Sequence, residues 1–151
     1  MKKVLLVYPG YIVREQPLNI LYIGSAVKAA GHAVALFEIS SYRRRPLRGD
    51  PYRVIKENYE KLCDRFKPDV VGFSVMSVNT RIALELARLT KRRSPNVLTV
   101  FGGIHPTIAP EETISEAAID AICRGEGEAS FTEFLAALDR GGDYTRIPGF
   151  W

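Results

Sequence analysis

Residues 69–77 read DVVGFSVMS, an apolar run that ends in small polar residues. Apolar residues at successive positions are typical of a strand that is covered on both faces, as in a parallel sheet. Four more runs of this kind are KVLLVYP at 3–9, AVALFEIS at 33–40, NVLTVFGG at 96–103 and IDAICRG at 119–125. The sequence therefore predicts five buried parallel strands.

Segments with helical period separate and follow these strands, at 17–32, 50–68, 81–95, 109–118 and 128–142. Asp50 is expected to cap the second helix with Pro51 at its first position, and Asn79 or Thr80 is expected to cap the third. Five strand-helix units of this kind predict an α/β doubly wound, three-layer sandwich around a five-stranded parallel sheet, flavodoxin-like or Rossmann-like.

Composition limits the classes of protein that fit. The chain has 151 residues, 46% of them hydrophobic, which suits one domain with one core. A net charge of +4 is too small to require nucleic acid, and the basic runs at 43–48 and 91–93 are interpreted as a solvated turn and a helix end. The apolar start of the chain is too short to span a membrane. Two separate cysteines, Cys63 and Cys123, favour a cytoplasmic location and give no metal motif.

The loops after the strands are the expected ligand-binding region, because ligands of open α/β sheets bind at the carboxyl ends of the strands. Two of these loops, 8–16 and 102–112, are longer than such connections need. Neither GxGxxG nor GxxxxGK[ST] occurs, which argues against the usual phosphate cradles. A receiver domain would need an acidic residue where Tyr8 and Pro9 stand, and a lysine where Glu126 stands.

The third and fourth strands end in residues that suit an inserted ligand. Ser74 ends the apolar part of one strand and the pair Gly102 and Gly103 ends the other, so a hydroxyl would lie beside two positions without a side chain. The segment 125–128, GEGE, places two more glycines at a strand-to-helix turn. The alternative is structural: a serine bonded to its own backbone, and glycines that allow tight packing or a left-handed turn.

These elements carry a resemblance. SVM at 74–76 and GG at 102–103 are similar to the S-x-L and GG elements of cobalamin-binding domains. The order of further stretches resembles the N-terminal domain of cobalamin-dependent radical SAM proteins, the group that includes the anaerobic magnesium-protoporphyrin monomethyl ester cyclases. These stretches are PLNILYIGSAVKAAGH at 17–32, DVVGFSVMS at 69–77, VFGGIHPTIAPEE at 100–112, RGEGEASFTEFL at 124–135 and IPGFW at 147–151.

The resemblance implies cobalamin as the ligand, with its corrin ring across the carboxyl edge of the sheet and its nucleotide tail between the third and fourth strands. It implies that the following residues bind the cofactor: Ser74, Met76 and Ser77 near the tail, Gly102 and Gly103 beside its channel, Ile104, His105, Pro106 and Thr107 at the corrin rim, Gly125, Glu126 and Gly127 at the amide side chains, and Tyr8 and Pro9 near the lower face.

The sequence also departs from the family pattern. The DxHxxG element is absent and no histidine precedes His32, so we expect base-off cobalamin without a histidine ligand, its lower face covered by Tyr8, Pro9 and Tyr11. The radical SAM motif CxxxCxxC is absent. The resemblance implies a cobalamin-binding domain at 1–146 and the start of a linker at 147–151. The [4Fe–4S] cluster and S-adenosylmethionine would then belong to a downstream radical SAM domain, and this module would bind without catalysing.

Two other classes of function remain open from the residues. A flavodoxin-like enzyme or sensor for another small ligand would use His105 with Glu111, Glu112 or Glu126 as acid and base groups. A pure interaction domain would leave the two long loops unexplained.

Overall fold

A five-stranded parallel sheet forms the centre of the molecule. The structure, a computed structural model, describes residues 1–10, 17–40 and 51–151. The strands are β1 (Lys3–Tyr8), β2 (Ala33–Glu38), β3 (Val70–Ser74), β4 (Leu98–Gly102) and β5 (Ala121–Cys123). They run parallel in the order β2-β1-β3-β4-β5. The predicted doubly wound sheet is confirmed, and the winding reverses between β1 and β3.

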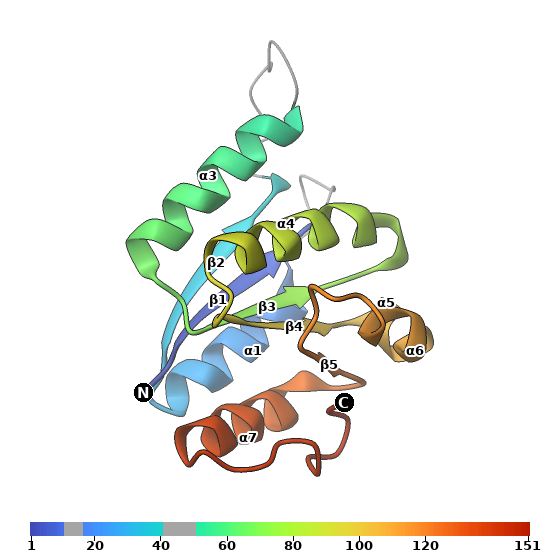
Figure 1. The fold of residues 1–151 in the computed structure, drawn as a ribbon. Helices are drawn as coiled ribbons and strands as arrows, with labels where there is room; N and C mark the ends of the chain where they lie inside the picture. Colours follow the sequence, from blue (N-terminus) through green and yellow to red (C-terminus); the bar gives the residue numbers. More distant parts are fainter. Residues whose placement is uncertain (11–16, 41–50) are drawn as a thin grey trace.

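Helices cover both faces of the sheet (Figure 1). One face carries α1 (Leu18–Ala29) and α7 (Gly127–Asp139), and the other carries α3 (Pro51–Phe66) and α4 (Thr80–Arg93). Successive residues of a strand point to opposite faces, so Leu5 joins the core under α3 and α4 while Leu6 joins the core under α1 and α7. Two buried cores explain why each strand is apolar at nearly every position.

The segment after β4 differs from its prediction. Two short helices, α5 (Ile104–Ile108) and α6 (Pro110–Ile114), replace the predicted loop and the single helix at 109–118. Gly103, at φ 98°, turns the chain, and the backbone N–H of His105 then donates to the carbonyl of Val75 at 3.0 Å. Pro106 falls in the first turn of α5, where a missing N–H costs no helical hydrogen bond. Pro106 in the first turn of α5 and Pro110 at the first position of α6 therefore both suit the starts of helices.

Asn79 occupies the N-cap position of α4, as predicted, but its side chain does not bond to that helix. The side chain of Asn79 accepts a hydrogen bond from the backbone N–H of Met76 at 2.9 Å and gives no side-chain cap to α4. It closes the 3-10 turn η1 (Ser77–Asn79), and the hydroxyl of Thr80 donates to carbonyls of that same turn. The predicted cap Asp50 lies outside the described residues.

The last residues of the chain lie along the free side of β5 (Figure 1). Phe150 forms an antiparallel bridge with Cys123, and Trp151 exchanges two backbone hydrogen bonds with Ile122. The N–H of Arg124 donates to the carbonyl of Gly149 at 2.8 Å. The segment predicted as the start of a linker therefore continues the sheet edge. Within the described part of the chain, none of the helices combines the length and apolarity that a membrane crossing needs.

Candidate functional site

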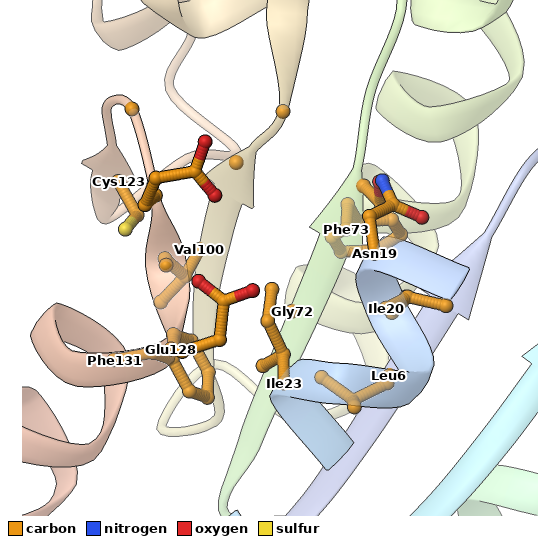
Figure 2. A pocket seen from close by; sticks show the side chains of 16 residues that line it. Leu6, Asn19, Ile20, Ile23, Gly72, Phe73, Val100, Cys123, Glu128 and Phe131 are labelled. Atoms are coloured by element: carbon orange, nitrogen blue, oxygen red, sulfur yellow. The ribbon is translucent and has the colours of Figure 1, made fainter. Parts of the chain in front are cut away.

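A cavity, here called the sheet–helix slot, opens at the carboxyl edge of the sheet between the strands and the two helices α1 and α7 (Figure 2). Side chains of α1 border one side, and those of α7 and β5 border the other. The slot is lined by Leu6, Asn19, Ile20, Ile23, Gly72, Phe73, Ser74, Val100, Gly102, Gly103, Cys123, Gly125, Glu126, Gly127, Glu128 and Phe131. It brings together Ser74, both glycines of the 102–103 pair and the 125–127 segment, as predicted.

Strand register divides the sheet wall of the slot into two rows. The upper row pairs Ser74 with Gly102, and Gly102 with Cys123. The lower row pairs Gly72 with Leu6 on one side and with Val100 on the other. Residues two apart on a strand share a face, so both rows point toward α1 and α7. The slot thus has a mouth that contains a hydroxyl and a deeper part formed mainly by apolar residues, into which the side chain of Glu128 projects from α7 (Figure 2).

The two glycines of the 102–103 pair have different structural roles. A Cβ on Gly102 would meet its nearest neighbour, the carbonyl oxygen of Cys123, at 3.5 Å, which is ordinary contact. A Cβ on Gly103 would lie 2.9 Å from the carbonyl oxygen of Val75, and its φ of 98° disfavours any other residue. Gly102 therefore keeps the slot open, whereas Gly103 is required by the backbone turn into α5.

Ser74 has a partner that sequence reasoning missed. The side-chain amide of Asn19, from the start of α1, donates to the hydroxyl oxygen of Ser74 at 3.0 Å across the mouth of the slot. The only sign in the sequence is one amide in an otherwise apolar stretch, LNILYIG. The bond joins α1 to β3, and in it the hydroxyl oxygen of Ser74 is the acceptor.

The rim of the slot is built from the segments that follow β4 and β5. The hydroxyl of Thr107 donates to the carbonyl of Gly103 at 2.8 Å and accepts the N–H of Gly125 at 3.0 Å. Gly125 adopts φ 72°, and a Cβ there would meet nothing within 4 Å. Gly127 lies close to Ile23, because a Cβ would be 3.1 Å from its methyl group. Thr107 thus joins both loops, and Gly127 lets α7 approach α1.

Cys123 contributes a neutral thiol to the slot. Burial, and to a smaller extent the nearby charge of Glu128, raises the pKa of this thiol to about 11. The thiol is therefore protonated at neutral pH and is a poor nucleophile or metal ligand. The described residues contain no group of three or more His, Cys, Asp or Glu side chains that could hold a metal ion.

His105 lies outside the slot. It is buried, its Nδ1 is 3.2 Å from the hydroxyl of Ser77, and it borders a separate small cavity with Glu112 and Glu116. Glu126 lines the slot instead. The structure therefore does not bring His105 and Glu126 into one cavity, which removes the geometric basis for that acid-base pair.

The remaining predicted residues surround the slot without lining it. Ile104 is exposed at the carboxyl edge, together with Ile108 and Val78, although all three are apolar. Pro106 is buried, and neither Met76 nor Ser77 lines the slot. Pro9 is buried, and the ring of Tyr8 lies where a side chain on Gly10 would be. Tyr11 falls outside the described residues.

Relatives of the chain are enzymes several times its length. An uncharacterized methyltransferase of Pyrococcus horikoshii is 32% identical over 134 residues, covering 88% of this chain and 27% of the relative. The anaerobic magnesium-protoporphyrin IX monomethyl ester cyclase of Synechocystis sp. is 32% identical over 142 residues, covering 91% of this chain and 27% of the relative. The chain thus spans about a quarter of their length.

The fold recurs in a solved enzyme. The radical S-adenosylmethionine methyltransferase TsrM from Kitasatospora setae, with cobalamin and a [4Fe–4S] cluster bound, superimposes with a TM-score of 0.81 at 21% identity. The match covers 99% of this chain and 28% of TsrM. The family profile described as B12 binding domain matches residues 3–135. The chain therefore belongs to the family of B12-binding domains, as the resemblance in its sequence predicted.

Proposed function

We propose that this B12-binding domain holds the nucleotide tail of cobalamin in the sheet–helix slot, with the corrin ring across the carboxyl edge of the sheet. The observation that carries the proposal is the pairing of Ser74 with Gly102 directly above Gly72. Gly102, without a side chain beside the hydroxyl of Ser74, leaves room at the mouth for an inserted group and one hydrogen bond to orient it, whereas Leu6 and Phe131 pack closely over Gly72. The residues present therefore fit the cofactor.

The surface around the slot suits the corrin ring. Ile104, Ile108 and Val78 present apolar side chains at the edge where the ring would lie, with exposed fractions of 61%, 68% and 77%. A ligand site usually combines such apolar area with a few polar groups that fix orientation. Here Gly125 and Glu126 would supply backbone groups and a carboxylate for the amide side chains of the corrin.

We further propose that no histidine of this chain coordinates the cobalt. The chain has two histidines. His32 lies at the amino edge of the sheet, where its Nδ1 accepts the backbone N–H of Lys2 at 3.1 Å. His105 is buried with its Nδ1 next to Ser77. With the tail in the slot, the cofactor's own base is also held away from the metal. Tyr8 and Pro9 would then approach the lower face.

The whole protein is proposed to be a cobalamin-dependent radical SAM methyltransferase or cyclase. The supporting fact is that the chain spans 27% of the methyltransferase and cyclase relatives that it resembles. A downstream domain, entered through residues 147–151, would hold the [4Fe–4S] cluster and S-adenosylmethionine. Bound cobalamin supplies the carrier for a methyl group or the radical chemistry, and this domain orients it and excludes water.

Two further expectations belong to this proposal. A cytoplasmic location is supported by Cys63 and Cys123, both free thiols in the structure. A role without nucleic acid is supported by the pairing of basic side chains: Arg93 binds Glu60 and Asp64, at 3.3 and 2.7 Å. Charges neutralised in this way do not form a phosphate-binding surface.

The test is retention of cobalamin by the purified chain. Hydroxocobalamin is added, unbound corrinoid is removed by desalting, and the visible spectrum of the protein fraction is recorded. We expect about one corrinoid per chain, and less for Ser74→Val, which removes the hydroxyl but keeps the shape of the β3 end. Ser115→Val, an exposed serine whose hydroxyl donates only to the carbonyl of Glu112, is the matched control. Absence of corrinoid on the unaltered chain would overturn the proposal.

A further inference from the structure

The hydrogen bond between Asn19 and Ser74 is a long-range contact made by a residue type that usually bonds locally. Asparagine near the start of a helix commonly bonds to nearby backbone. The start of α1 has no side-chain cap, and the amide of Asn19 instead donates to the hydroxyl oxygen of Ser74 at 3.0 Å, across 55 positions of sequence. Figure 2 shows Asn19 in the first turn of α1, beside the end of β3. The bond is therefore part of the wall of the slot.

This bond sets the hydrogen-bonding roles of the Ser74 hydroxyl. A serine hydroxyl has one proton to donate, and its oxygen can accept. An amide N–H only donates, so the oxygen of Ser74 accepts from Asn19 and the hydroxyl proton remains to be donated. Among the described residues none accepts that proton, and this includes the two carboxylates that line the slot, Glu126 and Glu128. The Ser74 hydroxyl is thus a donor without an acceptor at the mouth of the slot.

The neighbour of Ser74 on β4 leaves room for an acceptor. Gly102 pairs with Ser74 in the register of the two strands, and both residues line the slot with Asn19. Neighbouring strands lie about 4.8 Å apart, so a ligand atom placed over Gly102 is within reach of the hydroxyl. The place that a side chain would take on β4 is therefore the place where the Ser74 proton can be used.

We propose that Asn19 is a positioning residue for the cofactor, which holds the Ser74 hydroxyl as a donor to an acceptor atom of the nucleotide tail. The inference rests on the proposed function, since it assumes that the tail enters the slot. The acceptor is an atom with a lone pair and no proton: a phosphate oxygen, a ribose ring oxygen or a ring nitrogen. Asn19 acts through Ser74, so its contribution to binding requires the hydroxyl of Ser74.

Asn19→Asp reverses the polarity of the bond with almost no change of shape. A carboxylate only accepts, so the proton of Ser74 turns toward position 19 and the ligand meets an oxygen lone pair in its place. The helix is not weakened, because the first turn of α1 has no acidic residue and a negative charge there suits the helix dipole. A bond that only joins α1 to β3 survives this substitution, whereas a bond that orients the hydroxyl is inverted.

The experiment is a double-mutant cycle on the affinity of the chain for hydroxocobalamin, measured by equilibrium dialysis. We expect Asn19→Asp to raise the dissociation constant about fivefold or more, the size of one lost hydrogen bond. In the Ser74→Val background the same change should alter it by less than about twofold, because the group through which Asn19 acts is gone. Equal effects in both backgrounds, or no effect when Ser74 is present, would overturn the inference. Absence of corrinoid on the unaltered chain would overturn the proposed function instead.

Two controls separate positioning from charge and from stability. Leu18→Asp adds the same charge to the same turn, at an exposed residue that does not line the slot, and should change the dissociation constant by less than about twofold. A loss equal to that of Asn19→Asp would assign the effect to charge and contradict the inference. Urea unfolding should show that Asn19→Asp is as stable as the unaltered chain. A destabilised variant that loses affinity in both backgrounds would assign the bond to the fold alone.

Discussion

The ring of Phe150 stacks on the ring of Phe134, with centroids 4.6 Å apart and an interplanar angle of 12°. Phe134 is fully buried in α7, and Phe150 also contacts Phe131, which lines the sheet–helix slot. The C-terminal segment is thus joined to the core directly beneath the proposed tail site.

Replacing Phe150 with alanine should therefore destabilise the domain. Loss of a buried aromatic ring costs about 3 kcal/mol or more, because a cavity remains where the ring was. Urea unfolding followed by circular dichroism measures the change. Trp151→Ala is the matched control: Trp151 is 43% exposed and its ring contacts the guanidinium of Arg124, so we expect a smaller loss. Equal losses for the two variants would contradict the stacking role of Phe150.

The two glycines of the 102–103 pair should give opposite results when each is changed to alanine. Gly103→Ala forces a Cβ against the backbone of Val75 at positive φ, so the free energy of unfolding should fall by about 1–3 kcal/mol. Gly102→Ala should fold normally but narrow the slot and weaken cobalamin binding. Urea titration and equilibrium dialysis on both chains check this. A Gly102→Ala chain with unchanged affinity would place the tail elsewhere.

Electron paramagnetic resonance of the cob(II)alamin complex tests the lower face of the cobalt. We expect no nitrogen superhyperfine splitting, because His32 is at the opposite edge of the sheet and His105 is bonded to Ser77. His105→Ala should leave the spectrum unchanged. Splitting that disappears in this variant would make His105 the axial ligand, while splitting that persists would show that another nitrogen, such as the cofactor's base, is bound.

Anaerobic reconstitution with iron and sulfide should give no stoichiometric cluster on this chain. A [4Fe–4S] site needs several clustered thiolates, and the chain has only Cys63 and Cys123, which the structure places in separate cores. Iron and sulfide analysis after desalting checks the expectation. A cluster bound in a one-to-one ratio would contradict it.

The thiol of Cys123 should react slowly while the domain is folded. With a pKa raised to about 11, only about a thousandth of it is thiolate at pH 8, so iodoacetamide should label it far more slowly than in urea. Cys63, whose pKa is also raised to about 11 by burial, should behave alike, so peptide mapping must separate the two. The folded state holds both thiol protons more tightly than the unfolded state does. The contribution of the two thiols to the free energy of unfolding is therefore fully present below pH 9 and is lost as the pH rises toward 11. Rapid labelling of Cys123 in the folded chain would show that the slot is wetter than described.

The strands could be predicted because burial on both faces leaves apolar residues at nearly every position. The short helices after β4 could not. Pro106 and Pro110 are residues typical of a loop. Only the hydrogen bond from the backbone N–H of His105 to the carbonyl of Val75 shows that the chain turns directly into a helix. Likewise asparagine is a common residue at helix N-caps, but the side chain of Asn79 accepts a hydrogen bond from Met76 in the turn before the helix.

The candidate site was predicted at its mouth and missed in its depth. Ser74, Gly102 and the 125–127 segment follow strands in the sequence, so the position of each in the chain predicts it at the carboxyl edge, where the slot opens. The sequence predicts Leu6 and Val100 only as core residues, because burial by a helix and burial around a ligand leave the same apolar pattern. Gly72, inside a strand, was a usable sign of a close approach. No local pattern could show that Asn19 reaches β3 from α1.

The hydroxyl of Thr107 has a thermodynamic consequence. It joins the chain after β4 to the chain after β5, so the rim of the slot exists only while those two strands are paired. A ligand that binds this rim binds the folded state and not the unfolded one. Its binding free energy is then added to the stability of the sheet, with a gain that grows with the logarithm of free ligand concentration. In this domain, binding of the cofactor and pairing of β4 with β5 are therefore thermodynamically coupled.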